Sequence, residues 1–233
     1  VFIKLSLDTQ DYPVIEEYFG KAKIALTYIL KGNKLTIETR IENKDTKAIP
    51  MSLAFHPWFN TPTKSKWQVK IPAHKYWPSE NKLSIDKPQY VTGTKFDLRE
   101  FTSLEERTYD DVLTKLEFKE GRFNAFLYNP QDTTLIEVTQ DEVFRHIVLY
   151  VPCDKDTVCL EPQTSSTDAF NLHEQGIRES TLLVLLPKET SNAKIWITAS
   201  SVLDKNIDRQ SSSPIQEEQI SINIPHSFKQ GPL

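Results

Sequence analysis

Two residues in this chain combine the residue types and surroundings that proton transfer requires. His56 stands between aromatic residues and directly before Pro57, which is typical of a strand end where a loop meets a cleft. Glu161 ends an apolar run and precedes Pro162, so we expect a rigid strand to carry its carboxylate to the end of a sheet. Partial burial there raises the pKa of a carboxyl group and suits it to general-base catalysis. The simpler alternatives are a core histidine bonded to the backbone and a surface glutamate at a strand terminus.

Two adjacent carboxylates, Asp110 and Asp111, form a third candidate. Successive side chains of a strand point to opposite faces, so at most one of these two can face a pocket shared with other residues. The alternative is turn chemistry, in which an aspartate bonds to the local backbone.

The elements that must position these residues are predicted to be strands. Residues 24–30 and 34–41 are β-rich runs on either side of Lys31-Gly32-Asn33, which is a hairpin signal. Residues 1–7 alternate like the middle of a strand. Similar runs return at 67–71, 125–128, 135–138, 144–151, 157–160, 182–186 and 194–199. No stretch of 12 or more residues has a helical apolar period, so we predict an all-β sandwich or barrel.

Composition excludes several classes of function. The net charge of −4 gives no basic surface for nucleic acid, and the 6 glycines form no phosphate-binding loop. The strongest apolar run, residues 182–186, is too short to span a membrane. Cys153 and Cys159 lack companion ligands at zinc spacing, so we interpret them as reduced thiols of a cytoplasmic protein and predict no metal site.

The C-terminal part differs in composition. Residues 204–219 are polar and include Ser211-Ser212-Ser213-Pro214, which cannot bury enough apolar area to offset the entropy of ordering. Residues 220–224 alternate again and could add an edge strand. We therefore expect one β-sandwich domain over 1–200 and a polar, flexible segment over 201–233.

Four segments carry a resemblance to a known family. In chain order they are Phe55–Asn60, Phe96–Arg99, Tyr109–Thr114, and Leu160–Thr164 with Asp168–Asn171. In identity and order these segments resemble the aldose 1-epimerase (galactose mutarotase) family, most closely its bacterial branch with His-Pro-Tyr-Phe-like and Leu-Glu-Pro-Met-Thr-like motifs. The resemblance covers about residues 11–199. It implies a large antiparallel β-sandwich, the galactose mutarotase-like supersandwich.

The resemblance also implies roles for individual residues. Glu161 matches the general base that removes the proton from the anomeric hydroxyl, and His56 matches the general acid that protonates the ring oxygen. Asp110 matches the aspartate that hydrogen-bonds sugar hydroxyls. The predicted substrate-binding set also includes Trp58, Asn60 and Gln163. No cofactor and no metal is expected in the reaction.

The implied reaction interconverts the α and β anomers of a hexose. Opening a hemiacetal moves one proton off O1 and one onto O5, so an acid and a base must flank the ring together. The sugar is the expected partner, with no nucleic acid and no membrane. The alternatives are a carbohydrate-binding β-sandwich without turnover and a domain of a larger carbohydrate-active enzyme.

The chain departs from the family in one respect. Members of that family have further N-terminal strands, which carry an arginine and often a second histidine that contact the sugar. These strands are absent from the 233 residues. Because their absence would expose sheet edges and apolar surface, we expect either further N-terminal sequence in the functional protein or a partner chain that covers the gap.

Overall fold

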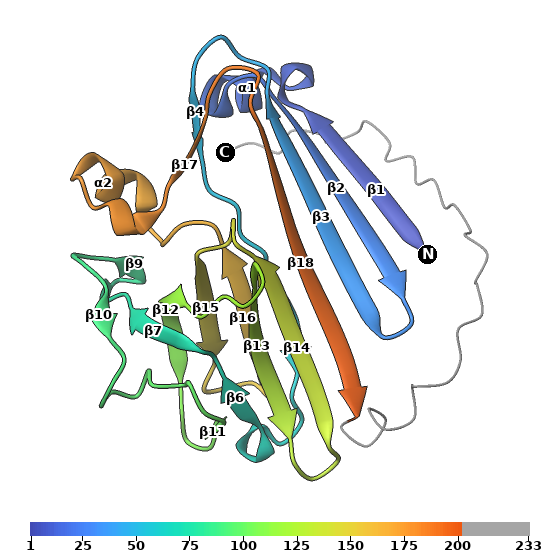
Figure 1. Ribbon diagram of the computed structural model, residues 1–233, viewed down its shortest axis with the longest axis vertical. Coiled ribbons are helices and arrows are strands. Elements are labelled where there is room, and N and C mark those ends of the chain that lie inside the picture. Colours follow the sequence, from blue (N-terminus) through green and yellow to red (C-terminus); the bar gives the residue numbers. More distant parts are fainter. Residues whose placement is uncertain (202–233) are drawn as a thin grey trace.

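The computed structural model describes residues 1–201, and most of them belong to two large antiparallel sheets (Figure 1). The larger sheet consists of β1 (Phe2–Asp8), β2 (Ala22–Lys31), β3 (Lys34–Asn43), β6 (Gln68–Lys70), β11 (Thr102–Ser103), β13 (Arg122–Asn129), β14 (Thr134–Asp141) and β18 (Thr190–Ser201). Its strands lie in the order β1-β2-β3-β18-β14-β13-β6-β11.

The smaller sheet consists of β5 (Trp58–Asn60), β7 (Ala73–Tyr76), β10 (Gln89–Tyr90), β12 (Tyr109–Leu116), β15 (His146–Val151) and β16 (Thr157–Gln163). Its order is β10-β7-β12-β15-β16-β5, and every pairing is antiparallel. Strand β15 therefore lies between β12 and β16. The segment with Asp110 and Asp111 in β12 and the segment with Glu161 in β16 therefore lie on either side of β15.

Short elements complete the described part of the chain. They are the strand pairs β4 (Ile49–Met51) with β17 (Leu183–Leu185) and β8 (Ser79–Glu80) with β9 (Leu83–Ser84), the helices α1 (Pro13–Phe19) and α2 (Ala169–Glu174), and the 3₁₀ turns Thr9–Asp11, Lys64–Lys66 and Arg178–Ser180. Among the described residues, none of the helices has the length and apolar character that crossing a membrane requires. The absence of a long helical period in the sequence agrees with these short helices.

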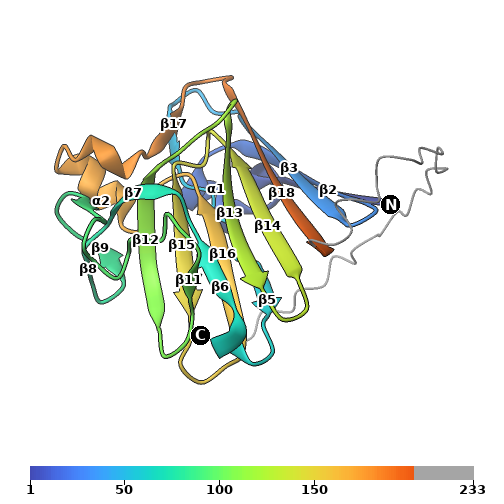
Figure 2. The ribbon, with the colours of Figure 1, turned by 60° about the horizontal axis from the view of Figure 1, so that its bottom comes forward.

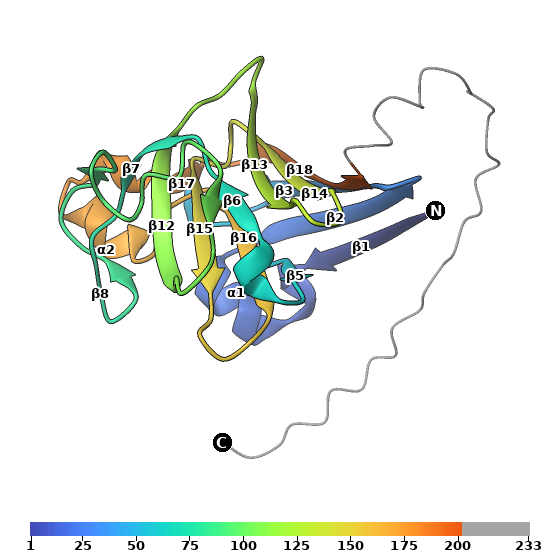
Figure 3. The same ribbon diagram turned by 90° about the horizontal axis from the view of Figure 1, so that it is seen from below.

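The main core lies between the two sheets. In Figure 2, β12, β15 and β16 run beside β13 and β14. Alternate side chains of these strands belong to one buried apolar cluster. Leu113, Leu149 and Leu160 come from the smaller sheet, and Leu127 and Val138 come from the larger one. Strands β1–β3 reach away from the smaller sheet, and α2 lies on the opposite side of the molecule (Figures 1 and 3).

The predicted hairpin is confirmed in detail. Strands β2 and β3 pair up to Lys31 and Lys34, which leaves a two-residue turn at Gly32-Asn33. Gly32 has φ = 58°, and Asn33 has no positive φ. Glycine at the first central position with φ > 0 is the signature of a type II′ turn, whose twist matches that of the flanking strands. The all-β fold predicted from such runs is confirmed as well.

Most strand ends differ from the sequence prediction by one to four residues, and two of these differences lie near the candidate residues. Strand β15 begins at His146 rather than Phe144, because Phe144 closes a turn by donating its N–H to the carbonyl of Asp141. Strand β16 continues through Pro162 to Gln163 instead of ending at Glu161. The predicted segment 201–233 and its strand at 220–224 lie outside the described residues, apart from Ser201, which ends β18.

The proline within β16 has a physical explanation. The N–H and C=O of one strand residue point to the same side, and the carbonyl of Pro162 accepts the N–H of Phe55. The missing N–H therefore faces the short segment before β5, and β15 loses no ladder bond to Pro162. For this reason Glu161 sits inside a strand rather than at its end.

Candidate active site

The register of three neighbouring strands gathers the candidate side chains on one face of the smaller sheet. Tyr150 on β15 is paired with Asp110 on β12 and with Cys159 on β16. Directly opposed residues in antiparallel strands point to the same face, as do residues two apart along one strand. Asp110, Tyr150, Cys159 and Glu161 therefore share the face that points away from the main core.

The imidazole of His56 contacts the carboxylate of Glu161, with 3.2 Å between Nε2 and Oε1. Only 9% of the Glu161 side chain is exposed, whereas 52% of the His56 side chain is exposed. The preceding Phe55 positions the histidine, because its N–H donates to the carbonyl of Pro162 and its ring packs against Phe144. The pair thus joins a buried carboxylate to an imidazole that faces solvent.

Two aromatic rings border this pair. Trp58 lies parallel to the imidazole of His56, with 5.4 Å between ring centroids and 5° between planes. Tyr150 presents its ring edge-on to both, at 6.4 Å from His56 and 5.7 Å from Trp58. Because 49% of Trp58 is exposed, its ring can stack on the apolar face of a polar, ring-shaped ligand.

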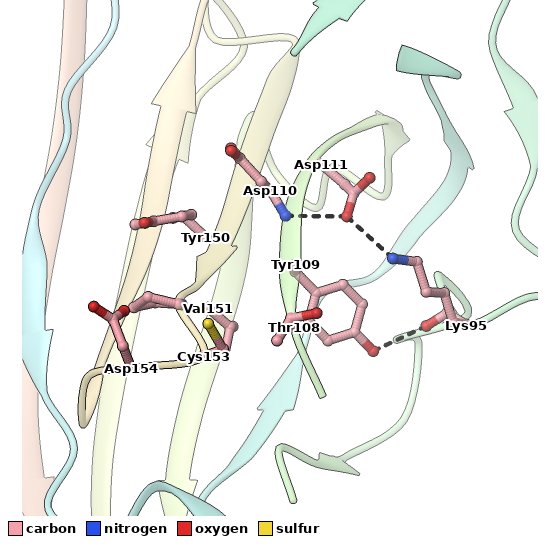
Figure 4. A pocket seen from close by; sticks show the side chains of 10 residues that line it. Lys95, Thr108, Tyr109, Asp110, Asp111, Tyr150, Val151, Cys153 and Asp154 are labelled. Carbon is pink, nitrogen blue, oxygen red and sulfur yellow. Dashed lines mark hydrogen bonds and ion pairs between the residues drawn. The ribbon is translucent and has the colours of Figure 1, made fainter. Parts of the chain in front are cut away.

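The two adjacent carboxylates point in different directions, as the alternation of a strand predicts. Asp110 lies on the face of Tyr150 and forms an ion pair with Lys82, with 2.9 Å between Oδ2 and Nζ. Asp111 forms its ion pair with Lys95 instead, at 3.6 Å. Figure 4 shows the two side chains diverging at a pocket of about 430 Å³ that Asp110, Asp111 and Tyr150 all line. The expectation that at most one of the two carboxylates faces a shared pocket is therefore wrong for this pocket, although the two side chains point in different directions.

Burial changes the acidity of Glu161. It raises the pKa of this carboxyl group from 4.5 to about 7, and the negative charge of Asp110 contributes in the same direction. A carboxyl group with a pKa near 7 gains and loses a proton readily at neutral pH. The geometry and the electrostatics together describe an acid/base pair on an accessible face, with an aromatic ring and a second carboxylate nearby.

The comparison with protein families matches this chain to the family Aldose 1-epimerase over residues 1–198. The chain belongs to the aldose 1-epimerase family. The match begins at residue 1, ten residues before the start of the resemblance seen in the sequence motifs.

Individual relatives agree with this family. Human galactose mutarotase is 29% identical over 136 residues, a match that covers 53% of this chain and 39% of that protein. The crystal structure of a galactose mutarotase-like protein from Clostridium acetobutylicum superposes with a TM-score of 0.75 at 20% identity, covering 86% of this chain and 63% of that one. For galactose 1-epimerase from Lactobacillus acidophilus NCFM the TM-score is 0.66 at 17% identity, with coverages of 85% and 62%.

These structural likenesses show a shared fold, the galactose mutarotase-like sandwich that the sequence predicts. The matched part of the human relative is about two fifths of its length. The expectation that further N-terminal sequence or a partner chain completes the protein stays a prediction.

The remaining residues of the predicted aldose 1-epimerase site flank the acid/base pair. Asn60 pairs with Thr157, two residues beyond Trp58 and on the side away from Glu161. Gln163 lies two residues beyond Glu161 in the other direction and is opposed to His146. The structure thus brings together His56, Glu161 and Trp58, with Asp110 on the same face, and places Asn60 and Gln163 at opposite ends.

Sequence reasoning missed two residues that border this site. Tyr150 stands in a predicted strand, but its place on the site face follows from its pairing with Asp110 and Cys159, which the sequence does not give. Lys82, the partner of Asp110, lies in the turn between β8 and β9. No local pattern connects that turn to Asp110, so only the tertiary structure reveals the ion pair.

Three potential metal ligands meet in the candidate site. Ligand atoms of His56, Cys159 and Glu161 all lie within 4.8 Å of one another. Burial raises the pKa of the Cys159 thiol to about 12, and the Glu161 carboxylate adds to this rise. The sequence offered no such group, because these residues are distant in the chain and the spacing rules for zinc sites describe local pairs.

His146, the first residue of β15, is fully buried. Its Nε2 lies 2.8 Å from the Oγ1 of Thr181. Burial lowers its pKa from 6.5 to about 3, and the neighbouring charge of Arg145 acts in the same direction. This imidazole is therefore neutral at physiological pH.

Proposed function

We propose that this chain catalyses the interconversion of the α and β anomers of a free aldose, with Glu161 as general base and His56 as general acid. The observation that carries the proposal is the 3.2 Å contact between these two groups on an accessible face of the smaller sheet. Membership of the aldose 1-epimerase family supports the reaction type.

The chemistry needs two coordinated proton transfers. Glu161 takes the proton from the O1 hydroxyl while His56 gives a proton to O5, and the ring opens to an aldehyde. Rotation about C1–C2 then presents the other face of the aldehyde, and the same two transfers run backwards to close the ring. Each positioned transfer typically contributes about 10²- to 10⁴-fold to the rate.

The direct contact between the two groups suits this reaction. O1 and O5 are both bonded to C1, so the acid and base that serve them must lie close together, and a sugar bound over the pair can offer one oxygen to each. Because ring closure reverses both proton transfers, Glu161 and His56 end each cycle in their starting protonation states without a proton passing between them.

The other residues on this face bind the sugar in the proposal. Trp58 stacks on the apolar side of the pyranose, and Asp110 accepts hydrogen bonds from hydroxyl groups. Asn60 and Gln163 contact the sugar from the two ends of the site. A neutral hexose is the substrate we favour, since the Lys82 charge beside this site is paired with Asp110.

We place the protein in the cytoplasm. Both cysteines are free thiols, Cys153 at the surface and Cys159 in the interior. Free thiols persist in reducing compartments, which supports this location.

Polarimetry tests the proposed reaction. Freshly dissolved α-D-glucose and α-D-galactose are followed with the wild type, with Glu161→Gln and with Glu117→Gln. Glu117 forms the exposed ion pair with His74 at 3.0 Å and is therefore a matched control. We expect Glu161→Gln to lose at least about 100-fold in rate and Glu117→Gln to keep the wild-type rate. If the wild type is no faster than buffer on a panel of aldoses, the chain is a binding module and the proposal is wrong.

A further inference from the structure

The acid/base pair has a third neighbour whose chemistry the epimerase reaction does not use. Cys159 and Glu161 lie two apart on β16, so both point to the same face, and His56 reaches them from the segment before β5. The three ligand atoms are an imidazole nitrogen, a thiol sulfur and a carboxylate oxygen, all within 4.8 Å of one another.

We propose that His56, Cys159 and Glu161 form a binding site for Zn²⁺, and that an ion bound there blocks the proton-transfer pair. The site itself stands on the geometry of these three residues. Its inhibitory effect rests on the proposed function, because two of the three ligands are the proposed acid and base.

The donor set selects the kind of metal. Mg²⁺ and Ca²⁺ prefer sites made of oxygen ligands, whereas a mixed nitrogen, sulfur and oxygen set suits Zn²⁺. Zinc accepts three protein ligands with water in the fourth, tetrahedral position, as in catalytic zinc sites. The half-exposed side chain of His56 leaves that fourth position on the side of solvent.

The distances are compatible with a tetrahedral site. Zinc bonds of about 2.0–2.3 Å place neighbouring ligand atoms roughly 3.3–3.7 Å apart. Nε2 of His56 and Oε1 of Glu161 are already 3.2 Å apart. The thiol completes the triangle through side-chain rotation, since no pair of ligand atoms is more than 4.8 Å apart.

The surroundings hold the ligands in place. Trp58 lies parallel to the imidazole and limits its rotation, and the β15–β16 ladder holds the backbone of Cys159 and Glu161. Formation of the sulfur–zinc bond releases the thiol proton to solvent, while the carboxylate and the neutral imidazole bind through lone pairs. A bound ion therefore occupies the electron pairs that the epimerase reaction would use for protons.

The second histidine–glutamate pair of the described residues serves as an internal comparison. His74 and Glu117 are 3.0 Å apart, as close as His56 and Glu161, but the three-ligand group found in the described part of the chain does not include them. The proposal therefore predicts that zinc binds at the His56–Glu161 pair, which has a thiol nearby, and not at the His74–Glu117 pair.

Cobalt titration tests the site without using activity. The chain contains only two cysteines, so in Cys153→Ser protein the single remaining thiol is Cys159. We expect Co²⁺ to produce a 1:1 thiolate-to-cobalt charge-transfer band with tetrahedral ligand-field bands, and Zn²⁺ to displace the cobalt and abolish them. A further Cys159→Ser change should remove the charge-transfer band.

The histidine variants identify the second ligand. In the Cys153→Ser protein, His56→Asn should weaken cobalt binding at least about tenfold, whereas His74→Asn should leave it unchanged. Circular dichroism and thermal unfolding show whether each variant is folded. No charge-transfer band at millimolar cobalt, or a band that His56→Asn leaves as strong as before, would overturn the proposal.

Inhibition is measured separately by polarimetry. Zn²⁺ should slow anomer interconversion by the Cys153→Ser protein, and Cys159→Ser should raise the half-inhibitory zinc concentration at least about tenfold. If the bands form but Zn²⁺ does not inhibit an active enzyme, the blocking role is wrong. If no aldose is converted at all, the proposed function fails while the spectral result still decides the metal site.

Discussion

Trp58 covers one face of the His56 imidazole, with the two ring planes within 5° of parallel. The tryptophan thus limits the rotation of the proposed acid while its exposed half remains available to a sugar. One side chain therefore links the position of the proton donor to the position of the substrate. The first prediction concerns this link.

Trp58→Ala should raise KM for aldoses by about three- to tenfold, because an aromatic contact is worth about 0.5–1.5 kcal/mol. Trp58→Phe, which keeps a ring, should recover most of this loss. Trp196→Ala is the control, since Trp196 lies on β18 and its ring is contacted by Lys34 and Arg122 instead. Steady-state polarimetry measures all three. A wild-type KM in Trp58→Ala would show that the ring does not contact the sugar.

His56→Asn should lower kcat by at least about 100-fold while changing the free energy of unfolding little, because the imidazole is half-exposed. His74→Asn, in the exposed pair with Glu117, should keep the wild-type kcat. Polarimetry gives kcat, and chemical denaturation gives the free energy of unfolding. Equal losses of kcat in both variants would contradict the role assigned to His56.

Asp110→Asn should raise KM by about 10- to 100-fold, since a hydrogen bond to a charged group contributes about 1.5–3 kcal/mol. Asp111→Asn is the matched control, because the neighbouring carboxylate points to Lys95 instead. Both variants remove one negative charge, so a difference in KM between them reports the direction in which each side chain points. If Asp110→Asn and Asp111→Asn raise KM equally, the proposal that Asp110 and not Asp111 contacts the sugar is wrong.

Acid stability should depend on His146. The pKa of this buried imidazole is about 3 in the folded chain against an ordinary value of 6.5, so the unfolded chain binds an extra proton between these pH values. The free energy of unfolding should therefore fall by about 1.4 kcal/mol per pH unit from this residue as the pH drops below 6.5. At pH 5 the loss is about 2 kcal/mol.

His146→Gln provides the comparison for this prediction. Its amide can keep a hydrogen bond to Thr181 but does not titrate. Burial also raises the pKa of Asp141, which favours the folded state in acid, so the difference between wild type and variant is the informative quantity. Denaturant unfolding at pH 7, 6 and 5 should show the wild-type advantage shrinking. A difference that stays constant with pH would exclude a buried, neutral His146.

Much of this fold follows from local sequence. The β2–β3 hairpin is encoded by two β-rich runs and by a glycine that accepts positive φ. The ends of strands were harder to predict. Pro162 continues β16 because its missing N–H faces a short segment, and this depends on which neighbour lies on which side.

Part of the site could be predicted, because some of its residues stand out by their type and by their neighbours in the sequence. His56 and Glu161 stand out because each follows an aromatic or apolar segment and directly precedes a proline. Asp110 is selected over Asp111 by the resemblance to the family, because alternation shows only that the two side chains point apart. Tyr150 and Lys82 carry no such mark, and their place depends on strand order and on a distant turn. The grouping of Cys159 with the acid/base pair likewise requires the β16–β5 neighbourhood.

Strand β15 has a consequence for which sugars can fit. It hydrogen-bonds to β12 on one side and β16 on the other, so Asp110 and Cys159 are held two interstrand spacings apart, or about 10 Å, and Glu161 lies about 7 Å farther along β16. The hydrogen-bonded strands thereby fix the distance between Glu161, which we propose acts at the anomeric centre, and Asp110, which we propose binds hydroxyl groups of the sugar. A longer side chain at position 110 or 161 would move one of the two carboxylates. The distance between the two backbone positions would stay the same, because the hydrogen bonds between the strands set it.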